Sequence, residues 1–137
     1  MEAIHQLFEQ NNLLNHLNMK FHSFDGKKIV LTMPVLEEVT QPFGYLHGGA
    51  TVALCETAAS LGSKLLASDD EIPLGLEINA NHIRSVNSGT VEVRAEIVHK
   101  GQSTHIWQME VVQGETLISI SRATIAIKKK KENKRIR

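Results

Sequence analysis

The chain has 137 residues, of which 42% are hydrophobic and 22% are charged, and its formal net charge is zero. This size is typical of one domain with a single hydrophobic core. The only cysteine, Cys55, excludes an internal disulfide framework and a thiolate metal site, and no apolar run approaches the roughly 18 residues of a membrane span.

The neutral total hides two regions of opposite charge. Residues 1–127 carry eight basic and fourteen acidic side chains, which leaves a net charge of −6. Residues 128–137, KKKKENKRIR, carry seven basic and one acidic side chain, a net charge of +6. We therefore expect one folded domain over 1–127 and a disordered, solvated basic tail over 128–137. The N-terminus lacks the pattern of a signal peptide, which predicts a cytoplasmic protein.

The first third of the chain predicts short helices and a hairpin. Residues 2–17 place apolar side chains among polar ones in the pattern of one or two short amphipathic helices. Residues 19–24 and 28–34 flank Asp25-Gly26, a dipeptide that favours a tight turn, so a β-hairpin is expected there. Residues 37–45 are expected to form a loop.

The rest of the chain predicts one long helix and then four strands. Residues 48–67 are rich in Ala and Leu and contain no proline, as in a helix. After an acidic loop, the period of hydrophobicity changes to two, which indicates strands over 76–80, 91–97, 106–112 and 117–127. Strands in direct succession favour an antiparallel meander. The sequence therefore predicts an α+β domain in which one central helix packs against one antiparallel sheet.

Glu56 is the only carboxylate between Gly48 and Ser63. Burying a carboxylate in an apolar helix is costly unless it is paired or protonated, and the residues one turn away are not charged. Glu56 could lie on an exposed stripe, or it could act as a general base or nucleophile tuned by partial desolvation. Ser60 follows one turn later and could hydrogen-bond the carboxylate or a water beside it.

His47, Gly48 and Gly49 directly precede this helix. Glycines let a ligand approach the backbone, and the free N–H groups of a helix N-terminus point at developing negative charge, as in an oxyanion hole. Gly48 and Glu56 are about 12 Å apart along a helix, at ~1.5 Å per residue. The two residues therefore cannot act on one carbonyl from the same helix. If both are catalytic, a two-fold dimer must share its two sites between subunits.

Three segments carry a family resemblance: QPFGYLHGGATVALCETAAS (41–60), GLEINANHIRSVNSG (75–89) and KGQSTHIWQMEV (100–111). Together they resemble hotdog-fold acyl-CoA thioesterases of the 4-hydroxybenzoyl-CoA type, in particular the thioesterases of menaquinone biosynthesis and of enterobactin proofreading. The resemblance covers about residues 19–127. It implies a hotdog fold, in which a curved antiparallel sheet wraps a long helix.

The resemblance implies a role for each residue of the catalytic motif. Glu56 would be the catalytic nucleophile or general base, and the Gly48 amide would polarise the thioester carbonyl. His47 and Gln41 would support the carbonyl and the leaving group, and Ser60 would position the water or Glu56. The resemblance also implies a homodimer with shared active sites, assembled into a homotetramer.

The same resemblance implies a binding site for the nucleotide of CoA. Arg84, Ser103 and Thr104 match that site, with His82 nearby, and Phe43 is expected to line the acyl pocket. Many relatives carry an arginine after the glycine of the loop that reads KGQSTH here, so one expected phosphate contact is missing.

The leading hypothesis is hydrolysis of an aromatic or medium-chain acyl-CoA to the free acid and CoA. The CoA ester is the substrate, and no cofactor is expected. No metal site is expected either, because the seven histidines lack ligand spacing. The alternatives are a hotdog hydratase or dehydratase and a non-catalytic acyl-CoA-binding regulator. The tail lacks aromatic residues that could stack on bases, so a nucleic-acid partner is not expected.

Overall fold

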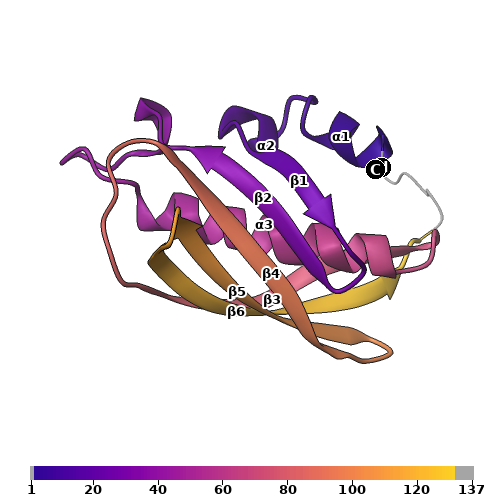
Figure 1. Ribbon diagram of the computed structural model, residues 1–137. Helices are drawn as coiled ribbons and strands as arrows, with labels where there is room; N and C mark the ends of the chain where they lie inside the picture. The colour runs from indigo at the N-terminus through magenta and orange to yellow at the C-terminus, as the bar shows by residue number, and fades with distance from the viewer. Residues whose placement is uncertain (1, 132–137) are drawn as a thin grey trace.

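The computed structural model describes residues 2–131, which form one helix-and-sheet unit (Figure 1). The elements in chain order are α1 (Glu2–Leu7), α2 (Leu13–His16), β1 (Lys20–Phe24), β2 (Lys28–Pro34), the 3₁₀ turn η1 (Glu37–Val39), α3 (Gly48–Leu66), β3 (Glu71–His82), β4 (Thr90–Lys100), β5 (Thr104–Gln113) and β6 (Thr116–Lys129). The predicted α+β class, the hairpin and the long helix are confirmed.

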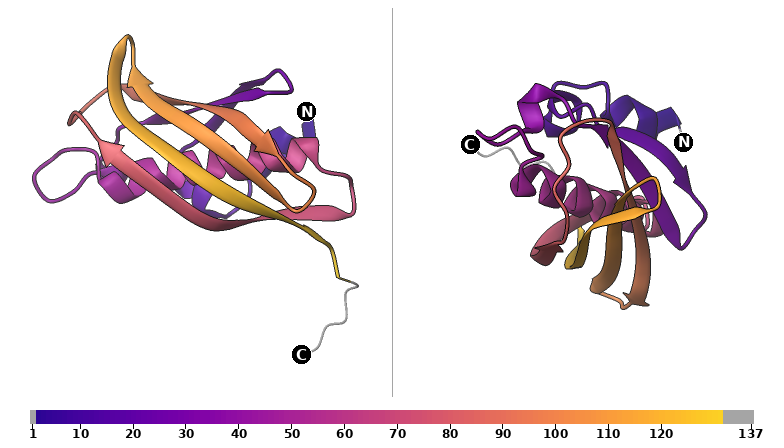
Figure 2. Two further views of the ribbon diagram at one scale, coloured as in Figure 1. Left: turned by 90° about the horizontal axis from the view of Figure 1, so that it is seen from below. Right: turned by 60° about the vertical axis from the view of Figure 1, so that its left-hand side comes forward.

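The six strands form one sheet in the order β1-β2-β4-β5-β6-β3, and every neighbouring pair is antiparallel. The sheet curves around α3, which lies along its inner face (Figures 1 and 2). Strand β3 follows α3 directly in the sequence, yet it pairs with the last strand, β6. The register between β3 and β6 therefore decides which residues lie beside the helix.

The core lies between α3 and the inner face of the sheet. Strand β2 shows why, because its side chains alternate between buried and half-buried positions, as expected for a strand with one covered face. Small residues on α3 allow the helix to pack closely. The buried side chains from both layers are Leu54, Cys55, Ala58 and Ala59 of α3, and Ile29, Leu31, Met33, Val91, Val93, Trp107, Met109 and Ile125 of the sheet.

Several element boundaries differ from the sequence prediction, among them those of β3 and β6. Strand β3 begins at Glu71 rather than at residue 76, and so includes Pro73. Proline cannot donate to a strand ladder, but it is tolerated in an edge strand such as β3. Strand β6 continues through Lys129, two residues past the predicted boundary at 127. In the tail predicted over 128–137, Lys128 and Lys129 pair with β3, and the Lys130 N–H donates to the Asp70 carbonyl at 2.7 Å. Residues 132–137 lie outside the described residues.

Strand β3 forms one edge of the sheet. Within residues 2–131 its only strand partner is β6, so its outer edge is unpaired. Two large apolar side chains on this strand are exposed, Leu74 at 46% and Leu76 at 61%. An unpaired edge with exposed apolar side chains is a ready template for another strand. The free edge of β3 therefore matters for how the site is assembled.

Candidate active site

The N-terminus of α3 carries an unsatisfied backbone donor. The Nδ1 atom of His47 accepts a hydrogen bond from the Gly49 N–H at 2.8 Å, and the His47 carbonyl accepts from Ala50 and Thr51. No acceptor within residues 2–131 bonds the N–H of Gly48. A free helix-terminal N–H is suited to binding an oxygen that gains negative charge. Gly48 thus has the geometry expected from the sequence.

His82, at the end of β3, lies against Gly48. A Cβ atom built on Gly48 would lie 2.7 Å from the Nε2 atom of His82, so only glycine fits without moving the ring. The Nδ1 atom of His82 is 3.2 Å from the hydroxyl oxygen of Ser119 on β6. His82 and, through it, Ser119 therefore lie beside the N-terminus of α3.

The carboxylate of Glu56 lies over Gly75 of β3, where a β-bulge interrupts the pairing with β6. A Cβ atom on Gly75 would overlap the Oε2 atom of Glu56, so the glycine makes room for the carboxylate. Glu56 is half-buried, and no hydrogen bond or ion pair to it occurs in the part of the chain that the structure describes. Ser60 is half-buried one turn later on α3. The carboxylate is thus free to meet a substrate or a water.

Cys55, the neighbour of Glu56, is not a competing nucleophile. The thiol is fully buried, and burial raises its pKa to about 11. A thiol with such a pKa stays protonated near neutral pH, and the thiolate is the reactive form. Within α3, Glu56 is therefore the better candidate for acid-base chemistry.

Gln41 organises the loop before α3. Its Oε1 atom accepts hydrogen bonds from the Phe43 N–H at 2.6 Å and from the Tyr45 N–H at 3.2 Å. This loop extends beyond the N-terminus of the helix (Figure 2), and the side chain of Phe43 is 83% exposed. The oxygen of the Gln41 amide is engaged in the loop, so only its NH₂ group remains as a donor for a ligand.

The residues predicted to bind CoA lie at opposite ends of the sheet. The Nη1 atom of Arg84 donates to the Leu117 carbonyl at 3.1 Å, whereas the Ser103 carbonyl accepts from the Ile127 N–H at 2.9 Å. Leu117 and Ile127 are about 33 Å apart along β6, at ~3.3 Å per residue. Within one chain, Arg84 cannot share a phosphate with Ser103 and Thr104.

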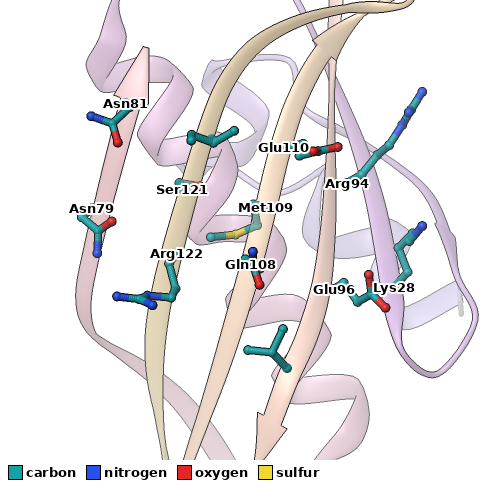
Figure 3. A pocket seen from close by; sticks show the side chains of 12 residues that line it. Lys28, Asn79, Asn81, Arg94, Glu96, Gln108, Met109, Glu110, Ser121 and Arg122 are labelled. Atoms are coloured by element: carbon teal, nitrogen blue, oxygen red, sulfur yellow. The ribbon is translucent and has the colours of Figure 1, made fainter. Parts of the chain in front are cut away.

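Two hollows of the structure lie away from Glu56 and Gly48. A hollow of about 540 Å³ lies on the outer face of the sheet, between charged side chains such as Arg94, Glu110 and Arg122 (Figure 3). A second, of about 520 Å³, lies between the end of α3 and the β4–β5 turn, next to Ser103. Neither hollow includes Glu56 or Gly48 among its lining residues.

The sequence interpretation missed two residues of this site. Gly75 makes room for Glu56, and Ser119 bonds His82. A glycine inside a strand is a signal for a bulge or a close approach, but the predicted strand began at residue 76, directly after Gly75. Ser119 gave no comparable signal, because its role depends on the register between β3 and β6.

Residues 2–131 contain no group of three or more His, Cys, Asp or Glu side chains that could hold a metal ion.

The described residues also include no helix that is both long and apolar enough to cross a bilayer.

Comparison with known proteins identifies related sequences along most of the chain. A family model described as "Thioesterase superfamily" matches residues 43–120. A protein of Listeria monocytogenes named 1,4-dihydroxy-2-naphthoyl-CoA hydrolase is 46% identical over 117 residues, which cover 85% of this chain and 95% of the relative. The Escherichia coli protein of the same name is 37% identical over 128 residues, 93% of each chain.

A solved structure agrees with the fold. The crystal structure of a thioesterase from Haemophilus influenzae superposes with a TM-score of 0.91 at 37% identity, and the match covers 98% of this chain and 94% of the other.

Proposed function

Because the chain belongs to the thioesterase superfamily, we propose that it hydrolyses an aromatic or medium-chain acyl-CoA to the free acid and CoA. The hotdog fold and the family that the sequence resembles are confirmed by the solved thioesterase and the family match. Two relatives are named as hydrolases of an aromatic CoA ester, which favours an aromatic acyl group here. The observation that carries the proposal is a free carboxylate and a free helix-terminal amide, both beside the unpaired edge of β3.

The chemistry follows from what each group can do. The thioester carbonyl oxygen accepts a hydrogen bond from the Gly48 N–H, which stabilises the negative charge that develops on that oxygen. Glu56 takes a proton from water, and the water oxygen forms a bond to the carbonyl carbon. The carbon–sulfur bond then breaks, and the CoA thiolate receives a proton. Glu56 could instead attack the carbonyl itself and form an anhydride, which water then hydrolyses.

The catalytic pair is divided between two places along β3. Gly48 lies beside His82 at one end of the strand, and Glu56 lies beside Gly75, nearer the other end. A two-fold axis near the middle of β3 would pair two copies of this strand antiparallel. The His82 end of one copy would then approach the Gly75 end of its partner, so each site would combine Gly48 of one subunit with Glu56 of the other.

The same two-fold axis would unite the divided CoA-binding residues. Arg84 follows the His82 end of β3, whereas Ser103 and Thr104 neighbour its Glu71 end through β6. An antiparallel pair of β3 strands would place Arg84 of one subunit near Ser103 and Thr104 of its partner. Two independent pairs of residues thus favour the same dimer.

The test of the proposal is Glu56→Gln. This variant keeps the shape of the side chain and removes its basic oxygen, so hydrolysis of CoA esters should fall by at least ~10² while the ester still binds. Hydrolysis is followed with a thiol reagent, and binding is followed by calorimetry. Glu56→Asp, which withdraws the carboxylate by about one methylene, should also be impaired. Near-wild-type turnover by Glu56→Gln would refute the mechanism.

Mixed dimers test whether the sites are shared. Glu56→Gln and Gly48→Pro subunits are each expected to be inactive, because proline at the first position of the helix removes the N–H and its Cβ atom also displaces the His82 ring. A doubly tagged heterodimer would contain one intact site, and should recover about half of the wild-type activity. A heterodimer as inactive as its parents would mean that each site belongs to one chain.

A substrate panel defines the acyl group. Aromatic CoA esters, including 1,4-dihydroxy-2-naphthoyl-CoA, are compared with medium-chain aliphatic esters by kcat/KM.

A single turnover in water enriched in heavy oxygen separates the two roles of Glu56, because label in its carboxylate indicates the anhydride route. The tetramer and the cytoplasmic location stay predictions.

A further inference from the structure

Two hydrogen bonds link His82, Ser119 and the backbone of β3. The hydroxyl of Ser119 donates to the Asn81 carbonyl at 3.1 Å, and the Nδ1 atom of His82 lies 3.2 Å from the same hydroxyl oxygen. Ser119 and His82 are register partners on β6 and β3, so both side chains lie on the same face of the sheet. This is the face on which Gly48 meets His82.

The network assigns the tautomer of His82. A carbonyl oxygen only accepts, so the single hydrogen of the Ser119 hydroxyl must lie between it and the Asn81 carbonyl. The Ser119 oxygen can then only accept from the imidazole, which places a proton on Nδ1 of His82. In the neutral ring Nε2 carries no proton, and it is the Nε2 atom that lies against Gly48.

His47 has the opposite tautomer at the same helix N-terminus. Its Nδ1 atom accepts from the Gly49 N–H at 2.8 Å, so in the neutral ring the proton is on Nε2. One imidazole therefore offers a donor and the other offers an acceptor. The Gly48 amide and His47 can serve an oxygen of the substrate, whereas the Nε2 atom of His82 requires an N–H or O–H group.

We infer that Ser119 is a positioning residue: it holds His82 in the Nδ1–H tautomer, so that Nε2 accepts a hydrogen bond from an amide N–H of the substrate's thiol arm. This inference rests on the proposed function, because it takes the substrate to be a CoA thioester. The pantetheine arm of CoA carries an amide N–H separated from the sulfur by two methylene groups. With the thioester carbonyl on the Gly48 N–H, this amide falls within reach of the neighbouring imidazole.

The tautomer is measured directly, without turnover. In protein labelled with ¹⁵N-histidine, the nitrogen resonances of His82, assigned by their loss in His82→Gln, should show a protonated Nδ1 and a bare Nε2 at neutral pH. Ser119→Ala should shift the proton to Nε2, the tautomer that free histidine favours. Ser119→Thr keeps the hydroxyl and should keep the wild-type spectrum. Ser121→Ala is the matched control, because Ser121 lies on the same strand and face but makes no bond to His82.

The binding role is measured with two thioesters of one acyl group. One has an N-acetylcysteamine leaving group, which retains the amide, and the other has a simple alkanethiol of similar length. Ser119→Ala should lower kcat/KM for the amide-bearing ester by about three- to tenfold, mainly through KM, since one neutral hydrogen bond is lost. The alkyl ester should be hydrolysed as by the wild type, and Ser119→Thr should restore the preference.

Several outcomes would overturn the inference. A Ser119→Ala protein in which His82 keeps its proton on Nδ1 would show that Ser119 does not set the tautomer. An equal loss on both esters would indicate a structural role only. Failure of the wild type to hydrolyse either ester or any CoA ester would refute the proposed function instead, and the nitrogen spectra would still decide the tautomer.

Discussion

The two ends of helix α3 differ in whether their polar groups have hydrogen-bond partners within the protein. At the N-terminal end, the Gly48 N–H has no acceptor within residues 2–131, and the rings of His47 and His82 are exposed. Near the C-terminal end, Ser63 is fully buried and accepts from the Nε1 atom of Trp107 at 2.8 Å. The Nδ1 atom of His105 lies 2.7 Å from the same hydroxyl.

Because of this difference, we expect one end of the helix to contribute mainly to stability and the other mainly to activity. The buried end satisfies its polar groups within the protein, and losing one partner leaves a buried group unpaired. The open end leaves its donor for a ligand. Substitutions along the active-site half should therefore reduce turnover more than folding, and substitutions at the buried end should do the reverse.

The largest expected effect is that of Gly75→Ala on turnover. The added methyl would displace the Glu56 carboxylate, and a misplacement of about 1 Å can cost ~10² in rate. Because the atom that must move is the end of a flexible side chain, the free energy of unfolding should hardly change. Hydrolysis rates and urea denaturation of the variant check both halves. A large loss of stability with normal turnover would contradict the comparison.

Gly62→Ala should have the opposite outcome. A Cβ atom there would overlap the ring of Trp107, which is fully buried and cannot move aside. We expect a loss of about 1–3 kcal/mol in the free energy of unfolding, as for other overpacked cores. The folded fraction should keep its kcat. Urea denaturation measures the loss, and an unchanged stability would show that the core has room at this position.

Ser63→Ala should destabilise the protein by a smaller amount, about 1–2 kcal/mol, because the buried Trp107 Nε1–H and the ring of His105 lose their common partner. Ser60→Ala is the matched control for stability, since Ser60 is one turn earlier on the same helix and only half-buried. Equal unfolding curves for the two variants would mean that the buried network contributes little.

The smallest expected effect is on the pH dependence of stability. Burial, together with nearby Lys100, lowers the pKa of His105 below its ordinary value of about 6.5, although Glu71 acts in the other direction. His105 therefore binds a proton more readily in the unfolded chain than in the folded chain. As the pH drops below about 6.5, this difference lowers the free energy of unfolding. His105→Gln should reduce that fall. Parallel curves for both proteins between pH 7.5 and 5.5 would contradict this.

Local patterns in the sequence were sufficient to predict the main helix and strands and to single out Glu56 as a candidate. The helix predicted over 48–67 follows from a composition rich in Ala and Leu without proline, and the strands follow from the hydrophobic period of two. Glu56 is conspicuous because the rest of this helix is apolar or uncharged up to Ser63. The number of residues between Gly48 and Glu56 was also sufficient to predict their distance along the helix axis. These features depend on residues that are close in the sequence, where elementary geometry is sufficient.

Long-range features could not be predicted in the same way. His82 and Ser119 are brought together only by the register of β3 on β6, which no local pattern determines. The use of the Gln41 amide oxygen within its own loop depends on how that loop turns. The predicted strand over 76–80 did not include Pro73, whose place at a sheet edge follows from the topology of the whole sheet.

The free edge of β3 also governs how the protein should respond to dilution. Under the proposed pairing, a separated subunit contains every catalytic residue and no working site, so specific activity depends on protein concentration. An assay at very low enzyme concentration would then record dissociation as inactivation, and added substrate, by bridging two subunits, would restore activity after a lag.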